Sequence, residues 1–348
     1  MRVIRPLNVA RLLALLLAFG VCIPSVAAEG ATKKKTTTRA VAKPAYSASA
    51  SQARKARLAR ARAAARAREQ ARVQALQEAM RPRFKTDATG ALVPDIRAAA
   101  AIIFDPESGQ VLWEENAQDK RSIASITKVM TALVFLEDSP DLNQEITVER
   151  GDVYAASTTY LRSNDRITLD EVLHLTLIAS DNAAARVLAR VSHGGTAPFI
   201  ERMNEKAVEL GLESTSFTDP SGLNPANVSS AYDLSRLISF ASANETIAPI
   251  MRTAAYSART SRRTINIRNT NHLVRGGEVD VLGGKTGFIT KAGYCLATLL
   301  RLPQSNHQVA VVVLGAGSNN GRFWETRHLF NWLADKASDA FVKEQESK

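Results

Sequence analysis

The segment Ser125-Ile126-Thr127-Lys128 places a hydroxyl and an amine three residues apart. Residues at that spacing share one face of a helix, so the two groups can meet if a helix begins here. The apolar residues that follow recur at helical spacing and predict a buried helix from Ile126 to Leu136. Burial lowers the pKa of a lysine, and a neutral amine can act as the base for a serine nucleophile.

Two more short motifs follow along the chain. Ser180-Asp181-Asn182 falls between two predicted helices, and Lys285-Thr286-Gly287 falls in a predicted strand after two further glycines. A glycine in a strand lets a ligand approach the backbone, and a lysine with a threonine can hold a carboxylate. Ser-x-Asn also occurs at 242–244 and 318–320. The first of these lies near a helix end and the second follows the third motif, so we favour Ser180.

Each motif alone is short enough to occur by chance, but their order is specific. Ser-x-x-Lys, Ser-x-Asn and Lys-Thr-Gly in this order are the signature of penicillin-binding proteins and serine β-lactamases. Over residues 96–338 the chain resembles the low-molecular-mass penicillin-binding proteins, the D-alanyl-D-alanine carboxypeptidases and endopeptidases. The stretches 121–124, 216–223, 229–234 and 285–294 resemble the same family.

The resemblance implies a fold and a catalytic set. The fold would be mixed α/β, a five-stranded antiparallel sheet flanked by helices with a helical subdomain. Ser125 would be acylated, and Lys128 would take its proton. Ser180 would relay a proton to the leaving amine, and Asn182 would hold the Lys128 amine and the substrate amide.

The third motif is implied to bind substrate. Lys285 would contact Ser180 and the terminal carboxylate of the substrate, helped by Thr286 in the Lys-Thr-Gly strand that continues through Gly287. The backbone N–H groups of Ser125 and Phe288 would form the oxyanion hole. No metal or other cofactor is expected.

The hydrophobic pattern independently predicts one mixed α/β domain over 95–342. Two early strands and three late ones must meet in one antiparallel sheet covered by helices. The expected strands are Ala98–Asp105, Val111–Glu115, Val281–Ile289, Cys295–Arg301 and Gln308–Leu314. The later helices are expected at Leu169–Ile178, Asn182–Val191, Ala197–Leu210, Ala231–Phe240 and Gly321–Phe341. Residues 343–348 would be a short C-terminal tail.

The first 28 residues are typical of an export signal. Three arginines precede the apolar stretch Leu12–Ile23, and small residues end at Ala28. Cleavage there would yield a periplasmic protein, and a retained membrane anchor is the alternative. Cys295 would then be the one cysteine left, and its apolar surroundings predict a buried small hydrophobe rather than a reactive thiol.

The net charge of +11 belongs to a tail rather than to the domain. Residues 29–85 carry 16 basic and 3 acidic residues, whereas residues 86–348 carry 26 basic and 31 acidic. We expect 29–94 to be a basic, low-complexity linker that is partly helical. It could be a spacer, or a tether to an anionic envelope polymer or to lipid headgroups. Nucleic-acid binding is the third possibility, and the export signal argues against it.

The bond that is cut remains open between two activities of the family. An endopeptidase cuts D-Ala–diamino acid cross-links, whereas a carboxypeptidase removes the terminal D-Ala. We favour the endopeptidase because the stretch from Gly284 to Leu296 resembles that branch, and because the chain stops soon after its last predicted helix. The expected ligands are peptidoglycan stem peptides, with β-lactam antibiotics as covalent inhibitors.

Two remoter alternatives fit the residues less well. A class A β-lactamase would need a deacylating Glu-x-x-x-Asn loop, where the chain instead has Asp219-Pro220-Ser221-Gly222. A non-catalytic binding protein with a basic tail would be expected to lose Ser125, Lys128 or Lys285, and all three are present.

Overall fold

A computed structural model describes residues 48–303 and 306–346, with side chains over 51–303 and 306–337. The predicted export signal therefore lies outside the described residues. The chain divides into two units, Met1–Arg66 and Ala67–Lys348. Across 48–303 and 306–346, no helix is both long and apolar enough to cross a membrane.

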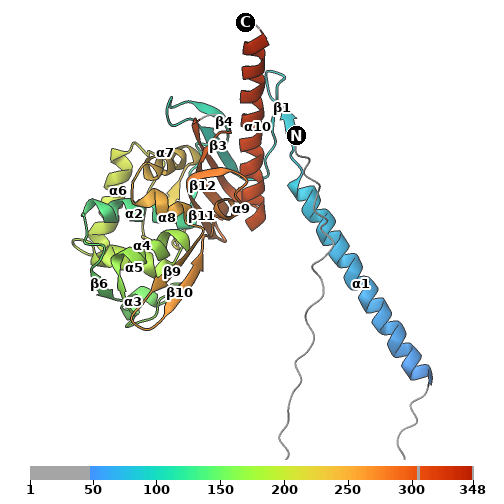
Figure 1. Cartoon of the computed structure of the whole chain (residues 1–348), viewed down its shortest axis with the longest axis horizontal. Coiled ribbons are helices and arrows are strands. Elements are labelled where there is room, and N and C mark those ends of the chain that lie inside the picture. Colours follow the sequence, from blue (N-terminus) through green and yellow to red (C-terminus); the bar gives the residue numbers. More distant parts are fainter. Residues whose placement is uncertain (1–47, 304–305, 347–348) are drawn as a thin grey trace, which may run out of the picture. The chain divides into compact units, whose positions relative to one another are not determined.

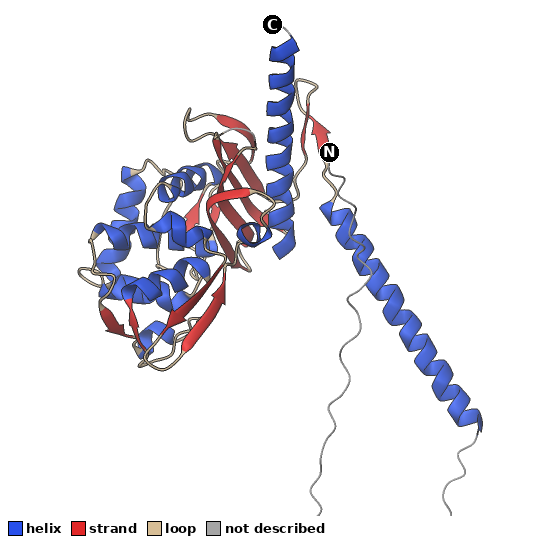
Figure 2. Cartoon of the chain, in the orientation of Figure 1, coloured by secondary structure: helices blue, strands red, loops and turns tan. Residues whose placement is uncertain are grey.

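The larger unit is built on one five-stranded antiparallel sheet (Figures 1 and 2). Its strand order is β11-β12-β13-β3-β4, so the two early strands pair with the three late ones, as predicted. β11 lies at one edge, which leaves the Lys-Thr-Gly motif on a strand with one open side. The strands are β3 (Ala100–Phe104), β4 (Val111–Glu115), β11 (Asp280–Ile289), β12 (Gly293–Arg301) and β13 (Gln308–Ala316).

Helices cover both faces of the sheet because its strands are apolar on both sides. Ile102 and Val312 are register partners, and both belong to the core that contains α7 (Ala231–Ser242). Ile103 and Val311 are the next pair, and they belong to a second core with α10 (Asn319–Glu346). Successive side chains of a strand point to opposite faces, which explains this division.

The helical subdomain surrounds α2, whose side chains are buried from Thr127 to Phe135. Thr168 caps α4, and Asp181 caps α5 by accepting a hydrogen bond from the Ala184 N–H at 2.9 Å. The predicted helices are present, each within a few residues of its expected bounds at the described ends. They are α2 (Thr127–Glu137), α4 (Leu169–Ile178), α5 (Asn182–Val191), α6 (Thr196–Glu209), α7 and α10.

Several short elements were not predicted from the sequence. Most have two to six residues, too few for a periodic pattern to stand out. They are the 3₁₀ turn η1 (Ala124–Ile126), α3 (Arg150–Val153), α8 (Ile247–Arg252), α9 (His272–Gly276), and the strand pairs β5–β8 (Arg121–Ser122, Val228–Ser229), β6–β7 (Glu145–Thr147, Arg166–Thr168) and β9–β10 (Ala255–Arg259, Thr264–Arg268). The β9–β10 hairpin flanks the site described below.

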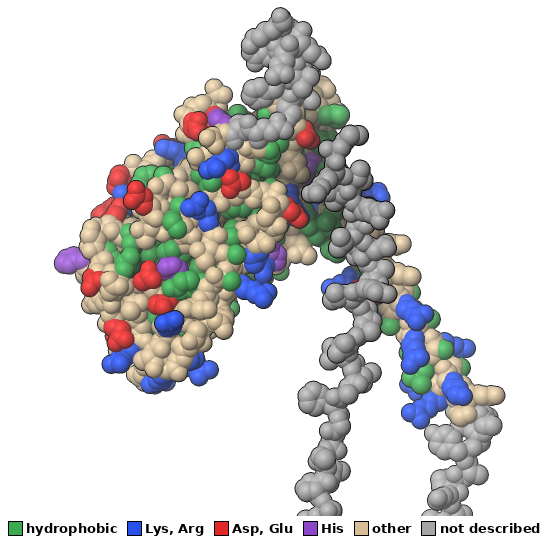
Figure 3. Space-filling view, in the orientation of Figure 1, with side chains coloured by type: hydrophobic (Ala, Val, Ile, Leu, Met, Phe, Trp, Pro, Cys, Tyr) green, Lys and Arg blue, Asp and Glu red, His purple; other side chains and the backbone are tan. Residues whose placement is uncertain are grey.

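The segment expected as a linker contains helix α1 (Ala48–Met80) and the hairpin β1–β2 (Phe84–Thr86, Leu92–Pro94). Where its side chains are described, α1 is exposed almost throughout, and Lys and Arg side chains gather along it (Figure 3). The hairpin contacts the domain, since the Phe84 ring lies edge-on to His328 and Lys85 Nζ lies 2.7 Å from Glu115. Ordered contacts with the domain thus begin before residue 95.

Candidate active site

The structure brings Ser125 and Lys128 together at the start of α2. Ser125 lies in the 3₁₀ turn η1, half-buried, and its Oγ is 3.0 Å from Lys128 Nζ. Lys128 itself has no exposed surface. The one-turn spacing in the sequence therefore becomes a direct contact between a hydroxyl and a buried amine.

The backbone just before Ser125 is held in an unusual conformation. Ala124 has φ +48°, a left-handed conformation that costs a residue with a Cβ about 1–2 kcal/mol. The hydroxyl of Thr127 donates to the Ala124 carbonyl at 2.8 Å. Gly222 packs against the same carbonyl so closely that a Cβ there would lie 2.0 Å from its oxygen. Only glycine allows this approach, so Gly222 helps to fix the turn that carries Ser125.

Lys128 makes two further contacts that set the direction of its amine. Nζ donates to Asn182 Oδ1 and to the Ser221 carbonyl, both at 2.6 Å. Burial lowers the pKa of Lys128 to about 7, against the attraction of Asp181 and Asp219. A neutral amine has two hydrogens and one lone pair. If the two hydrogens are donated to Asn182 Oδ1 and to the Ser221 carbonyl, the lone pair is directed at Ser125 Oγ.

The Ser180-Asp181-Asn182 motif turns between α4 and α5. Ser180 has φ +60°, and Asp181 anchors the turn by accepting from the Tyr160 N–H at 2.6 Å and from the α5 N-terminus. Burial raises the pKa of the Asp181 carboxyl despite these donors. Asn182 Nδ2 donates to the Ala156 carbonyl at 2.8 Å, which leaves its Oδ1 directed at Lys128.

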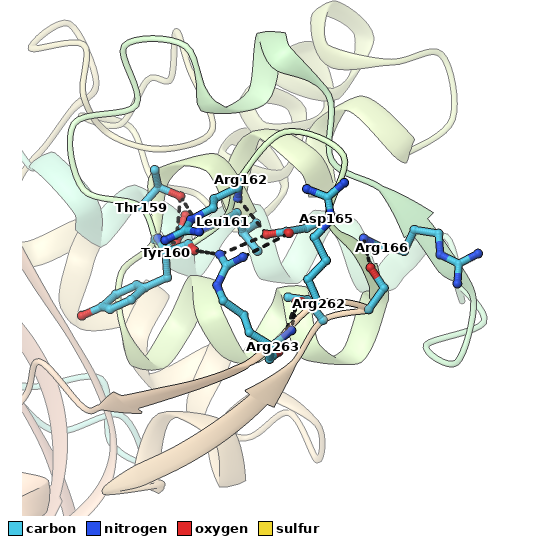
Figure 4. Close-up of polar contacts among 11 residues, drawn as sticks. Thr159, Tyr160, Leu161, Arg162, Asp165, Arg166, Arg262 and Arg263 are labelled. Atoms are coloured by element: carbon cyan, nitrogen blue, oxygen red, sulfur yellow. Dashed lines mark hydrogen bonds and ion pairs between the residues drawn. The ribbon is translucent and has the colours of Figure 1, made fainter.

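The loop that supports this motif is tied to the β9–β10 hairpin. In Figure 4, the guanidinium of Arg263 reaches Asp165 at 3.1 Å and the Tyr160 carbonyl at 2.6 Å. The Ser261 N–H donates to the Arg166 carbonyl at 2.8 Å. The hairpin tip, the 159–166 loop and the turn at Asp181 thus form one connected polar network.

Strand β11 supplies the opposite wall of the site. Lys285 Nζ lies 2.8 Å from Ser180 Oγ and 3.0 Å from the Thr286 carbonyl. Burial, with the positive charges of Lys128 and Arg322, lowers the pKa of Lys285 well below its usual value. The hydroxyl of Thr286 is bonded to that of Thr270 at 2.7 Å. The three predicted motifs therefore converge on one place.

At Gly287, strand β11 packs closely against the turn that carries Ser125. A Cβ at Gly287 would lie 2.6 Å from the Ile123 carbonyl oxygen, so a side chain cannot fit without displacing one of the two segments. The next residue, Phe288, is 49% exposed and stacks on Tyr294 with ring centroids 4.2 Å apart.

Some residues of this site were missed in the sequence. The Ser221 carbonyl and Gly222 belong to a stretch that matched the family without a role attached to it. Asp219 shapes that stretch, because its Oδ1 accepts from the Ser221 N–H at 2.6 Å and the Gly222 N–H at 2.9 Å. Thr270 carries no recognisable motif, and no sequence signal places it beside Thr286.

The prediction for Cys295 is confirmed. The side chain is fully buried in β12, and burial raises the pKa of its thiol to about 11. A thiol without access to solvent and with so little thiolate is unreactive at neutral pH.

Comparison with known proteins agrees with the fold and the motifs. Residues 87–318 match the family described as D-alanyl-D-alanine carboxypeptidase. The chain therefore belongs to the D-alanyl-D-alanine carboxypeptidase family, within the low-molecular-mass penicillin-binding proteins, as the resemblance implied.

Individual relatives lie on both branches of the family. The D-alanyl-D-alanine endopeptidase of Escherichia coli is 35% identical over 250 residues, which cover 71% of this chain and 80% of the relative. The carboxypeptidase DacD of the same organism is 32% identical over 253 residues, 69% of this chain and 63% of the relative. The Streptomyces K15 DD-transpeptidase has a similar crystal structure, with a TM-score of 0.65 and 30% identity over 69% of this chain and 97% of that chain.

Proposed function

We propose that this protein is a serine DD-peptidase that cleaves peptide bonds next to D-alanine in peptidoglycan through an acyl-enzyme. The observation that carries the proposal is the 3.0 Å contact between Ser125 Oγ and a Lys128 amine whose pKa is about 7. A base with a pKa near the working pH is half neutral there and can still accept a proton efficiently.

In the acylation step, Lys128 takes the proton of the Ser125 hydroxyl as Oγ attacks the carbonyl carbon of the D-alanine at the bond that is cut. A tetrahedral oxyanion forms at that carbon. The N–H groups of Ser125 and Phe288 are the proposed donors to this oxyanion. Loss of one such donor typically costs about 2.7–4 kcal/mol of barrier stabilisation.

The oxyanion collapses and expels the amine of the next residue, and the amine needs a proton to leave. Ser180 is the proposed carrier of the proton that Lys128 took from Ser125, because its hydroxyl lies 2.8 Å from Lys285 Nζ in the same site. Delivery of this proton to the amine leaves Lys128 neutral again. The carboxylate of the leaving residue would bind Lys285 and Thr286. An arriving anion raises the pKa of Lys285 and holds it as an ammonium.

Deacylation repeats the steps with water as the nucleophile. Water gives a proton to Lys128 and attacks the ester carbonyl, and Ser125 Oγ leaves with a proton returned to it. Asn182 keeps the Lys128 amine directed at Oγ in both halves of the cycle. A β-lactam acylates Ser125 in the same way, but its leaving amine stays tethered to the acyl group.

We infer that the bond cut is the cross-link between two stem peptides. Proteins named D-alanyl-D-alanine endopeptidase from Escherichia coli, Haemophilus influenzae and Pseudomonas aeruginosa are 35%, 35% and 32% identical to this chain. Removal of a terminal D-alanine is the second candidate, since relatives named carboxypeptidase reach 31–33%.

The place of action follows from the substrate. Peptidoglycan lies outside the cytoplasm, in agreement with an export signal over residues 1–28 and a periplasmic enzyme. The basic segment 29–85 would hold the enzyme near an anionic envelope polymer or lipid surface by charge.

Two measurements test the function. A labelled penicillin should acylate the wild-type protein but not Ser125→Ala, and the variant should keep the wild-type melting temperature. Purified cross-linked muropeptide dimers should be converted to monomers, identified by mass. Release of free D-alanine from a monomeric pentapeptide, with dimers left intact, would reassign the enzyme as a carboxypeptidase.

A further inference from the structure

The charge of the catalytic domain is unevenly distributed. Residues 246–277 contain six arginines and no aspartate or glutamate, although residues 86–348 as a whole carry more acidic than basic residues. Of the six, Arg263 alone has a carboxylate partner among the residues whose side chains are described. Figure 3 shows Lys and Arg side chains gathered over the end of the domain where β9 and β10 lie in Figure 1.

The hairpin presents a polar outer face to solvent. In β10, Thr264, Asn266 and Arg268 are exposed, whereas the two isoleucines between them are buried. Arg259 of β9 is the register partner of Thr264, so it shares this face. A second partner pair on this face is linked directly, because Ser257 Oγ donates to Asn266 Oδ1 at 2.8 Å. We call Ser257, Arg259, Thr264, Asn266 and Arg268 the outer hairpin face.

This face leads into the active site. Just past the end of β10, Asn269 is buried and Thr270, which lies in a bend, is partly exposed like the outer face of the strand. Thr270 is the residue whose hydroxyl is bonded to Thr286. Residues two apart along an extended chain are about 7 Å apart. Arg268 is two residues from Thr270, and its side chain is long enough to span that distance toward the group proposed to hold the leaving residue.

The chemistry of the leaving group decides what this face could bind. Thr286 and Lys285 are proposed to hold the carboxylate of the residue that departs with the amine, so whatever extends from that residue passes Thr270. For a carboxypeptidase nothing extends, because the leaving group is one free D-alanine. For an endopeptidase the leaving group is a second stem peptide, which carries further carboxylates.

We propose that the outer hairpin face binds the leaving stem peptide of a cross-linked substrate through its carboxylates, with Arg268 and Arg259 as the main contacts. This proposal rests on the function proposed above and names the part of the substrate that the enzyme recognises. Neither arginine forms an ion pair with a described carboxylate, so neither must be released before an anionic ligand binds. Basic residues along a cleft also raise the local concentration of an anionic substrate.

The test compares two substrates on matched variants. The wild-type protein, Arg259→Gln/Arg268→Gln and Arg252→Gln would be assayed with a purified cross-linked muropeptide dimer and with a labelled penicillin. Arg252 is an exposed arginine of the same segment, at the end of α8 rather than on the hairpin, so its variant measures the effect of removing one positive charge outside the hairpin. Dimer cleavage would also be followed with the carboxylates of the leaving stem amidated.

For the dimer, the double variant should have a KM about tenfold higher than the wild-type protein and a nearly unchanged kcat. A tenfold change corresponds to the loss of two charge contacts that are partly screened by solvent. Arg268→Lys should recover part of the loss, and amidated dimer should bind wild-type and double variant equally. Penicillin acylation should stay within twofold for all proteins.

Three outcomes would overturn the proposal. Unchanged dimer kinetics in the double variant would remove the hairpin face as a binding surface. If Arg252→Gln raises the KM for the dimer by the same factor, the effect is due to net charge and not to the hairpin. If the wild-type protein is acylated by penicillin but cleaves no dimer, the cross-linked peptide is not its substrate and the proposal is wrong. If the wild-type protein is not acylated, the proposed function itself is wrong, because Ser125 is then not the nucleophile.

Discussion

The guanidinium of Arg322 donates to the carbonyl of Gly287 at 2.9 Å and to that of Cys295 at 3.1 Å. Arg322 comes from α10, on the face of the sheet away from α2, and is 6% exposed. Burial lowers the pKa of Arg322 to about 10, so it remains a cation at neutral pH. The Gly287 carbonyl belongs to the same peptide group as the Phe288 N–H. A positive charge on that carbonyl polarises the peptide and strengthens the N–H as a donor.

Replacement of Arg322 by Met should therefore slow acylation by penicillin about tenfold or more. The physical reason is a weaker oxyanion donor, which would lose part of the about 2.7–4 kcal/mol that such a donor supplies. The measurement is the acylation rate at saturating penicillin, with the dissociation constant determined separately. Arg322→Lys should recover part of the rate because it keeps a positive charge. A fall in melting temperature with an unchanged acylation rate would restrict Arg322 to a structural role.

Acylation should rise with pH around neutrality. The pKa of Lys128 is lowered to about 7, and the neutral amine is the form that accepts the proton from Ser125. Below pH 7 the fraction of neutral amine falls about tenfold per pH unit, and above pH 8 it is nearly constant. The acylation rate measured from pH 5 to 9 should follow this curve. A rate independent of pH between 5 and 8 would assign the base to another group.

Gly222→Ala should destabilise the protein far more than Gly277→Ala. Both glycines have positive φ, +80° and +66°, so alanine pays a similar conformational cost of about 1–2 kcal/mol at either position. Gly277 has open space around it, whereas a Cβ at Gly222 would lie 2.0 Å from the Ala124 carbonyl oxygen. We expect Gly222→Ala to lose more than about 3 kcal/mol in urea unfolding. If both variants lose the same free energy of unfolding, the turn before Ser125 can rearrange at little cost to accept the added Cβ.

Removal of residues 29–80 should leave the hydrolysis of soluble muropeptides unchanged. The cut lies before the β1–β2 hairpin, so the contacts of Phe84 and Lys85 with the domain are kept. Retention on isolated envelopes should fall, and the difference from the intact protein should shrink as salt rises from about 50 to 500 mM. A difference that is insensitive to salt would make the segment a simple spacer.

The sequence predicted most of the sheet and the principal helices because their periodic patterns are long. The strand pair at 255–268 was missed for a physical reason. Three buried apolar residues, Ala258, Ile265 and Ile267, alternate there with arginine, serine and threonine, and this weak pattern resembles that of a loop.

The three motifs were recognisable because the roles proposed for them depend on the types of their side chains. The residues that hold these motifs in place were not recognisable from the sequence in the same way. Ser221 acts through a backbone carbonyl that any residue possesses, and Gly222 acts through the absence of a side chain. Arg322 reaches Gly287 across 35 positions of sequence from the other face of the sheet. Contacts of these kinds depend on the assembled fold and leave no local pattern.

The burial of Cys295 makes its thiol a probe of how the sheet opens. A reagent such as an alkylating label can reach a fully buried sulfur only when β12 separates from its neighbours, so the labelling rate in native buffer measures the free energy of that opening. A penicillin bound covalently at Ser125 would lie beside β11, because Gly287 of that strand packs against the turn that carries Ser125. Labelling before and after acylation would then report whether an occupied site tightens the strands behind it.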